Sequence, residues 1–182
     1  FRYSKLSRLI DATDVSITSN ITSVLMLKVI TPEFNTKAKY NITFNNPIRT
    51  SGIADETIKS SSFFVTSTEQ PVYIDDDGVG NLRLFYYTGT QTKVFLNKTL
   101  GTVNYTTGKL VINDLVILSA PNNEILIDCV PDSNDIVSVR NQIVAIRQNS
   151  TSVNVIVDTV ASGQFSGGTN YIFSSNTARW QV

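Results

Sequence analysis

The stretch LRLFYYTGTQTKVFLNKTLGTVNYTTGKLVINDLVIL, residues 82–118, alternates short apolar runs with polar turns. Its apolar runs are residues 82–87, 93–96, 110–112 and 115–118. The pairs Thr88-Gly89 and Thr107-Gly108 stand between runs, and these residue types accept positive φ or make local side-chain hydrogen bonds. Short strands joined by polar turns at regular intervals are typical of an antiparallel sandwich or meander.

The same pattern continues on both sides of this stretch. Further strands are expected at residues 63–65, 72–74, 124–130, 153–160 and 171–173, with turns at 77–78 and 122–123. In residues 38–45 apolar and polar residues alternate without exception, which predicts a strand with one solvated face. Residues 24–30 are apolar on both alternating faces, so a strand covered on both sides is expected there.

Three segments depart from the β pattern. Ser4 is expected to cap a short helix that ends at residues 11–14. Its apolar stripe at helical spacing consists of Leu6, Leu9 and Ile10. Residues 45–62 are expected to form mostly loop. Residues 132–148 fit either a helical stripe or a β-branched strand, and we favour a turn followed by a strand.

Length and composition agree with this assignment, since 182 residues with 41% hydrophobic side chains suffice for a real core. We expect a mainly β protein of antiparallel β-sandwich or meander units with one short N-terminal helix. Two domains are expected: a small α+β or β domain at residues 1–68 and a β-sandwich-like domain at 69–182. Because the chain opens at Phe1 without a methionine or a signal-peptide pattern, we expect both to belong to a longer chain.

Charge and residue usage remove several classes of function. Fifteen basic and fifteen acidic side chains give a formal net charge of zero, so nothing favours general attraction to nucleic acid or anionic membrane. Histidine is absent, and with it the commonest general base and zinc ligand. The single cysteine, Cys129, shares a strand face with Ile125 and Ile127, which indicates a small buried hydrophobe. We expect no enzyme activity, no catalytic, cofactor-binding or metal-binding residues, and no cofactor.

With no histidine and one cysteine, carboxylates are the remaining candidates for acid–base or metal chemistry. Asp75-Asp76-Asp77-Gly78 has the carboxylates of a calcium loop but not the alternating spacing, so a hairpin turn is expected in place of a cation site. Asp128, Asp158 and the acidic turn at 131–135 admit a hydrolase with paired carboxylates. Turn capping and a solvated strand face are the favoured interpretation.

Two sets of side chains suit binding. Arginine and tryptophan are frequent at interfaces, and the chain offers Arg140, Arg147, Arg179 and Trp180. An aromatic platform for carbohydrate would have to be built from Tyr86, Tyr87 and Tyr105. The alternative function is therefore an extracellular β-sandwich module that binds carbohydrate.

Three segments, taken in their order and spacing, resemble a known family. They are LSRLID at residues 6–11 with Asp14 and SNI at 19–21, GTVNYTTGK at 101–109, and PDSNDI at 131–136 running into VRNQI at 139–143. The set is similar to the C-terminal half of the baseplate wedge protein, gene product six, of T-even-type contractile-tailed bacteriophages. The similarity spans roughly residues 4–160.

The resemblance implies a structural role in the virion. It implies a wedge component that contacts copies of itself, as a homodimer or in a ring, and other baseplate wedge proteins around the hub. It also implies assembly in the bacterial host cytoplasm and no catalytic residues or required cofactors. Exposed sheet edges are expected to be the places where partner chains bind.

Overall fold

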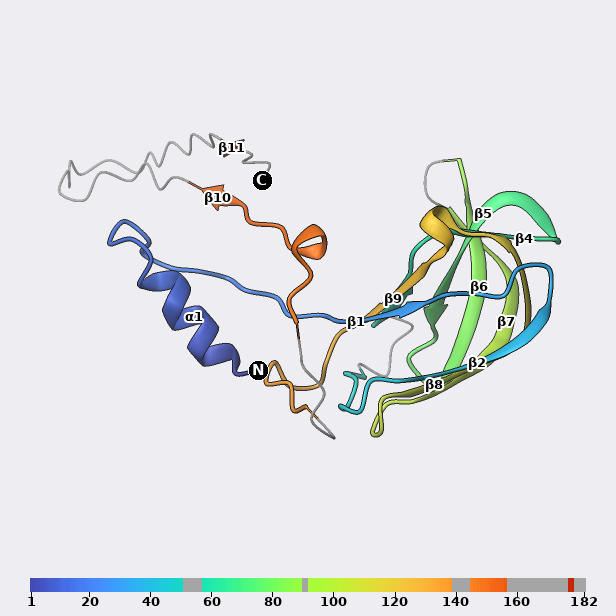
Figure 1. Cartoon of the computed structure of the whole chain (residues 1–182), viewed down its shortest axis with the longest axis horizontal. Coiled ribbons are helices and arrows are strands. Elements are labelled where there is room, and N and C mark those ends of the chain that lie inside the picture. Colours follow the sequence, from blue (N-terminus) through green and yellow to red (C-terminus); the bar gives the residue numbers. More distant parts are fainter. Residues whose placement is uncertain (51–56, 90–91, 139–144, 157–176, 179–182) are drawn as a thin grey trace, which may run out of the picture. The chain divides into compact units, whose positions relative to one another are not determined.

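The computed structural model describes residues 1–50, 57–89, 92–138, 145–156 and 177–178 (Figure 1). The contacts divide the chain into two compact units, Phe1–Gln142 and Ile143–Val182. The first unit begins with α1 (Tyr3–Asp11) and continues with strands β1 (Met26–Ile30), β2 (Lys37–Thr43), β3 (Ile58–Ser60), β4 (Phe63–Val65), β5 (Thr68–Asp76), β6 (Asn81–Thr88), β7 (Thr92–Asn104), β8 (Lys109–Ser119) and β9 (Ile125–Cys129). A short 3-10 turn, η1 (Pro121–Asn123), joins β8 to β9. The described part of the second unit holds a 3-10 turn, η2 (Gln148–Ser150), and the antiparallel pair β10 (Val155–Ile156) and β11 (Thr177–Ala178).

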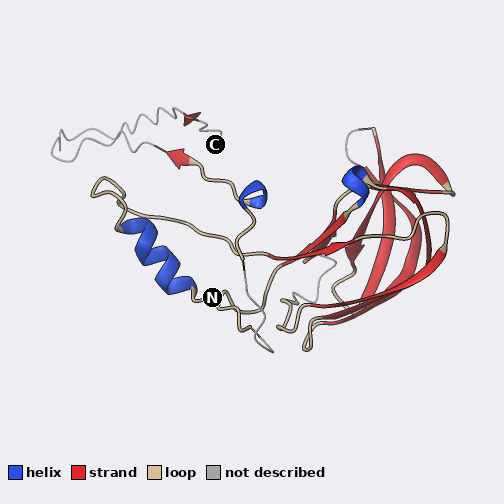
Figure 2. Ribbon diagram, in the orientation of Figure 1, coloured by secondary structure: helices blue, strands red, loops and turns tan. Residues whose placement is uncertain are grey.

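The nine strands of the first unit form one antiparallel sheet, drawn in red in Figure 2. Eight of them follow one another in the order β1-β9-β3-β5-β4-β8-β7-β6. β2 adds to β8, and β5 also pairs with β6, so that β5, β4, β8, β7 and β6 close into a ring. Among the described residues the chain is therefore mainly β with one α-helix near its N-terminus, which confirms the predicted fold class.

Strands from both sides of residue 68, where sequence analysis separated two domains, share this sheet. β1 pairs with β9, β2 pairs with β8, and β3 and β4 pair with β5. The hydrogen-bonded ladder thus runs across that position, and the division by contacts falls between Gln142 and Ile143.

The four expected turns are confirmed. Gly78, Gly89, Gly108 and both Asn122 and Asn123 have positive φ, as their residue types allow. At Gly108 the need for glycine is twofold, because a Cβ there would also lie 2.2 Å from the carbonyl oxygen of Asn46. The hairpin between β7 and β8 depends on that close approach.

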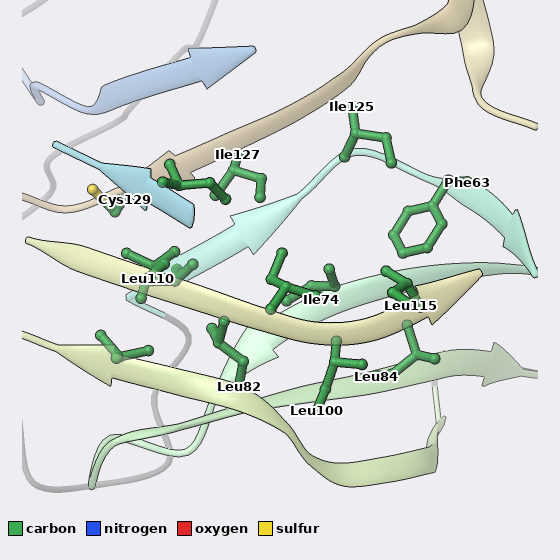
Figure 3. Packing of buried hydrophobic residues seen from close by; sticks show 14 of the residues in the cluster. Phe63, Ile74, Leu82, Leu84, Leu100, Leu110, Leu115, Ile125, Ile127 and Cys129 are labelled. Carbon is green, nitrogen blue, oxygen red and sulfur yellow. The ribbon is translucent and has the colours of Figure 1, made fainter. Parts of the chain in front are cut away.

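The core fills the inside of the closed sheet with side chains from almost every strand (Figure 3). Phe63, Ile74, Leu82, Leu110 and Ile127 are each at most 2% exposed. They come from five different strands, β4, β5, β6, β8 and β9. Burial of this apolar surface supplies the main stabilising free energy, at about 25 cal/mol per Å².

Several expected boundaries need correction. Ser4 is not the helix cap, because Arg2 holds that position and the carboxylate of Asp135 accepts from the Tyr3 backbone N–H at 2.8 Å. The described residues of 45–62 are mostly loop, as expected, but they also contain the short strand β3. The strand at 24–30 is not covered on both faces, because Leu25 and Val29, which share one face, are 55% and 45% exposed.

Other expected strands are longer than the apolar runs that predict them, or only partly described. The run at 93–96 belongs to β7, and the runs at 110–112 and 115–118 are one strand, β8, interrupted at Asp114 with φ 48°. The described residues after 131 begin with the expected turn. The strands expected after that turn and at 171–173 fall wholly or largely outside the described residues.

Candidate interaction surfaces

The outer face of β5, β6 and β7 carries a buried ion pair. Asp75 is 1% exposed although it points away from the core. The guanidinium of Arg83 donates to both of its oxygens, from Nε at 2.8 Å and from Nη2 at 2.9 Å, and Lys93 Nζ donates to Oδ2 at 2.7 Å. This bidentate geometry holds three neighbouring strands together, since each partner comes from a different one.

Aromatic rings cover that ion pair. Phe85 lies 5.8 Å from Tyr73, 5.2 Å from Tyr87 and 5.9 Å from Phe95 between ring centroids. Arg83 sits 4.7 Å from the Phe95 centroid and Lys93 sits 4.4 Å from the Phe85 centroid, distances at which cations are attracted to rings.

We call this set the aromatic face. It consists of Tyr73, Asp75, Arg83, Phe85, Tyr87, Lys93 and Phe95. Tyr87 is 40% exposed. Aromatic and arginine side chains of this kind are enriched where proteins meet one another.

Asp76 points the other way, into the unit, and is fully buried. Its Oδ1 accepts from the Ile58 backbone N–H at 2.9 Å, and its Oδ2 accepts from the Thr57 hydroxyl at 3.0 Å and the Tyr105 hydroxyl at 2.7 Å. The Gly78 backbone N–H adds a fourth hydrogen bond at 3.2 Å. Burial, together with the hydrogen bond to this carboxylate, raises the pKa of Tyr105 above its ordinary value.

Asp77 forms the turn itself, as predicted for the Asp-Gly pair. Its Oδ1 accepts from the backbone N–H groups of Val79, Gly80 and Asn81 at 2.9 to 3.0 Å. Burial acts to raise the pKa of Asp77, but these hydrogen bonds and one from the Asn81 side chain outweigh it and lower the pKa. The three adjacent carboxylates therefore have three separate surroundings, and each already accepts hydrogen bonds from the protein.

The remaining acidic candidates do not come together in the described part of the chain. Asp128 lies in β9, where burial raises its pKa, while Asp158 lies outside the described residues. Asp135 is used at the start of α1. Cys129 is fully buried, as its strand face predicted, and burial raises the pKa of its thiol. Within the described ranges, no group of three or more acidic or cysteine side chains is placed to hold a metal ion.

The expected carbohydrate platform is divided among three places. Tyr86 packs against the core, Tyr87 belongs to the aromatic face, and Tyr105 binds Asp76. Tyr73, Phe85 and Phe95 were missed as partners of Tyr87. Strand alternation was the signal that could have found them, because Tyr73, Phe85 and Phe95 are cross-strand neighbours.

The candidate arginines lie mostly outside the described residues. Arg140, Arg179 and Trp180 fall there, and Arg147 precedes η2 in the second unit.

The segment before β1 exposes apolar side chains. No residue of α1 is buried, and Leu9, in its apolar stripe, is 54% exposed. Val15 and Ile21, in the stretch that follows, are completely exposed. We call residues 1–25 the N-terminal segment.

Two sheet edges bound a groove. β1 has β9 as its neighbour and β2 has β8, and the chain turns back between β1 and β2 (Figure 1). The groove measures about 430 Å³ and is lined by residues 28–31 and 39–43.

No protein-family model, curated protein or solved structure matches the chain. In the described residues, no helix has both the length and the apolar character needed to cross a membrane.

Proposed function

We propose that this chain is a non-catalytic structural module of a phage tail baseplate wedge. It acts by contacts to copies of itself and to other wedge proteins in the ring around the hub. Its place is the virion, reached by assembly in the host cytoplasm, and it needs no nucleic acid, membrane or cofactor for that role.

The observation that carries the structural role is the N-terminal segment. A nine-residue helix is too short to be stable in water by itself, and helices in proteins are stabilised chiefly by burying an apolar face. The apolar stripe of α1 has no buried member in the described structure. A partner chain that covers Leu9 together with Val15 and Ile21 would supply that burial.

The aromatic face supports the same role. Its ion pair and rings form an ordered outer surface on three strands, and Tyr87 gives it an exposed apolar side chain with a polar hydroxyl. The carboxylates that reactive chemistry would need are engaged internally, Asp75 by two cations and Asp76 by four donors.

The specific assignment to a baseplate wedge is supported by the three ordered segments described above. In the structure the first falls in α1 with the chain after it, the second in the hairpin between β7 and β8, and residues 131–136 of the third in the turn after β9. Residues 139–143 lie outside the described residues. The first of the three is also the segment that exposes apolar side chains.

Cross-linking with mass spectrometry on whole phage particles tests the proposal. Lys5 in α1 is expected to cross-link to another baseplate protein or to a second copy of this chain. In solution, light scattering is expected to show self-association that Leu9→Glu abolishes. Arg8→Glu, one residue away and also exposed, is the matched control and should leave association intact. A monomeric mass at high concentration together with an absence of particle cross-links would refute the proposal.

A further inference from the structure

The groove between β1 and β2 presents free backbone groups from both strands. On β9, the Leu126 carbonyl oxygen accepts from the Ser61 N–H at 2.8 Å, and the Val130 N–H donates to the Thr57 carbonyl oxygen at 2.9 Å. The backbone N–H and C=O groups of the even-numbered β9 residues therefore point toward β3. The backbone groups of the odd-numbered β9 residues therefore point toward β1, where they pair with those of its even-numbered residues. The N–H and C=O groups of Leu27 and Val29 consequently point away from β9, to the free edge.

The edge of β2 follows by the same alternation. The Phe44 N–H donates to the Gly108 oxygen at 2.8 Å, on the side of β8. Ile42, two residues earlier, pairs with Leu110 on that side. The backbone groups of Asn41 and Thr43 therefore point away from β8, and both residues are exposed.

Two lysines are the only charged side chains among the residues that line this groove. Lys28 lies on β1 and Lys39 on β2, and the lining residues include no aspartate or glutamate. Neither lysine is a partner in the ion pairs seen among the described residues, such as those of Lys37 with Asp114 and of Asp75 with Arg83 and Lys93. Glu33 lies in the connecting loop, outside the lining, although its carboxylate is near enough to the lining residue Tyr40 to contribute, after burial, to raising the pKa of that phenol.

These lysines discriminate between possible occupants. Lysines on an edge strand, above all one on its inner face such as Lys28 beside Met26 and Ile30, disfavour pairing with ordinary strands. A second copy paired through the same edge would bring its own Lys28 or Lys39 against these cations. A strand with acidic side chains would instead meet opposite charge and free backbone groups together.

We propose that this groove binds an extended acidic segment of a partner protein by strand addition to the edge of β1. The segment pairs its backbone with Leu27 and Val29 and places carboxylates near Lys28 and Lys39. A segment of about five residues matches the five of β1. This site gives the proposed structural module the chemistry of one partner and rests on its acting through protein contacts.

The test uses the full chain, labelled with nitrogen-15, and a synthetic peptide, acetyl-Thr-Glu-Val-Glu-Val-Glu-Thr-amide. The peptide is expected to bind with a Kd of about 1 mM or tighter and to shift the amide signals of Leu27 and Val29 most strongly. The peptide Thr-Glu-Pro-Glu-Pro-Glu-Thr has the same charge but cannot form the ladder, and a version with lysine for glutamate has the opposite charge. Both are expected not to bind.

Variants separate charge from backbone pairing. The double change Lys28→Glu and Lys39→Glu is expected to weaken binding roughly tenfold or more. Lys98→Glu, an exposed lysine of β7 outside the groove, is the matched control and should bind normally. Val29→Pro removes an edge donor without removing a hydrogen bond to β9, so the protein should still unfold cooperatively while binding falls.

Equal binding of the proline peptide would show charge attraction alone and would overturn strand addition. No binding by the wild-type chain, equal binding by the double variant, or shifts confined to other strands would overturn the site. These outcomes leave the baseplate role untouched, because particle cross-links through Lys5 test it separately. If no such cross-links form while the acidic peptide binds, the acidic-segment site is supported and the baseplate role is not.

Discussion

Asp76 shows how one side chain can tie a closed sheet together. Its carboxylate holds the start of β3, the turn after β5 and the residue after β7 through four donors, one of them from Ile58 and one from Tyr105. A buried carboxylate is tolerated only when its hydrogen bonds are satisfied, and here donors surround both oxygens. The buried carboxylate of its neighbour Asp75, on the outer face, is instead paired with two cations, Arg83 and Lys93.

We predict that Asp76→Asn lowers the free energy of unfolding by about 3 kcal/mol. The amide places an NH₂ group against donors, and although the Thr57 and Tyr105 hydroxyls can turn to accept, the Gly78 N–H cannot. Urea unfolding followed by circular dichroism measures the change. Asp114→Asn, at an exposed ion pair, is the control and should change stability by less than about 0.5 kcal/mol. Equal effects at the two sites would contradict this account.

Tyr105 predicts a change at alkaline pH. Because the pKa of Tyr105 is raised in the folded state, the protonated phenol stabilises the fold fully below the unfolded pKa of 10.0, and this contribution is lost as pH rises through the folded pKa. Stability should therefore fall above about pH 10, and less steeply in Tyr105→Phe. At neutral pH the variant should lose about 1 to 2 kcal/mol for the missing hydrogen bond. Parallel stability curves for the two proteins from pH 8 to 11 would refute the assignment.

The roles of single residues were only partly predictable from sequence. The Asp-Gly pair identified the turn correctly, but the hairpin interpretation did not indicate that Asp75 and Asp76 are buried. Period-two alternation from Val72 and Ile74 places Asp76 on the buried face, which was a usable signal. Three of the four donors that make this burial tolerable come from the distant residues 57, 58 and 105, and the sequence pattern alone does not bring them together.

Where the strands of this fold begin and end depends more on the strands they pair with than on their own amino-acid composition. β3 is three residues long and polar at its centre, yet it is held between β5 and β9. β7 extends past its apolar run into exposed Asn97 and Thr99, where pairing with β6 shifts register. Apolar periodicity found the strands that bury one whole face and missed those that tertiary pairing creates.

Gly101, where β7 pairs with β8, illustrates this dependence on the neighbouring strand. A Cβ at this position would lie 2.0 Å from the Val111 carbonyl oxygen and 3.1 Å from the Ile112 Cα, both backbone atoms. We predict that Gly101→Ala lowers the free energy of unfolding by about 3 kcal/mol, since two strands must separate to admit it. Thermal unfolding measures the loss. Thr102→Ala, the exposed next residue, should stay within about 0.5 kcal/mol of wild type.

The helix α1 should be marginal in the isolated chain. It has nine residues, none of them buried, so most of its backbone hydrogen bonds lack tertiary protection. We predict that its amides exchange with deuterium within the first seconds, while those of β8 around Leu110 and Ile112 exchange slowly. Mass spectrometry of the exchanged protein reports both. Protection of α1 should rise on assembly into particles, and slow exchange in the monomer would contradict the claim that a partner completes it.

For the whole molecule, the sheet is built from strands on both sides of residue 68. Of the 21 buried side chains in the described core cluster, seven precede that residue. Local patterning identified strands 72–74 and 82–87 but not their partners, because pairing between distant segments such as β2 and β8 leaves no mark in a short window of sequence. The chemistry of the groove between β1 and β2 was beyond prediction for the same reason.

Two truncations follow from this arrangement. A chain of residues 1–142 keeps every strand of the nine-stranded sheet and should unfold cooperatively within about 3 °C of the full chain. A chain of residues 69–182 loses β1–β4, leaving β8 without β2 and the buried faces of Ile127 and Leu110 without Phe63 and Ile58. It should show no cooperative transition and should bind hydrophobic dye, since exposing that core costs more than a domain's whole stability margin. Calorimetry of both truncations decides the matter: a sharp transition in the shorter C-terminal chain would show that residues 69–182 fold without β1–β4.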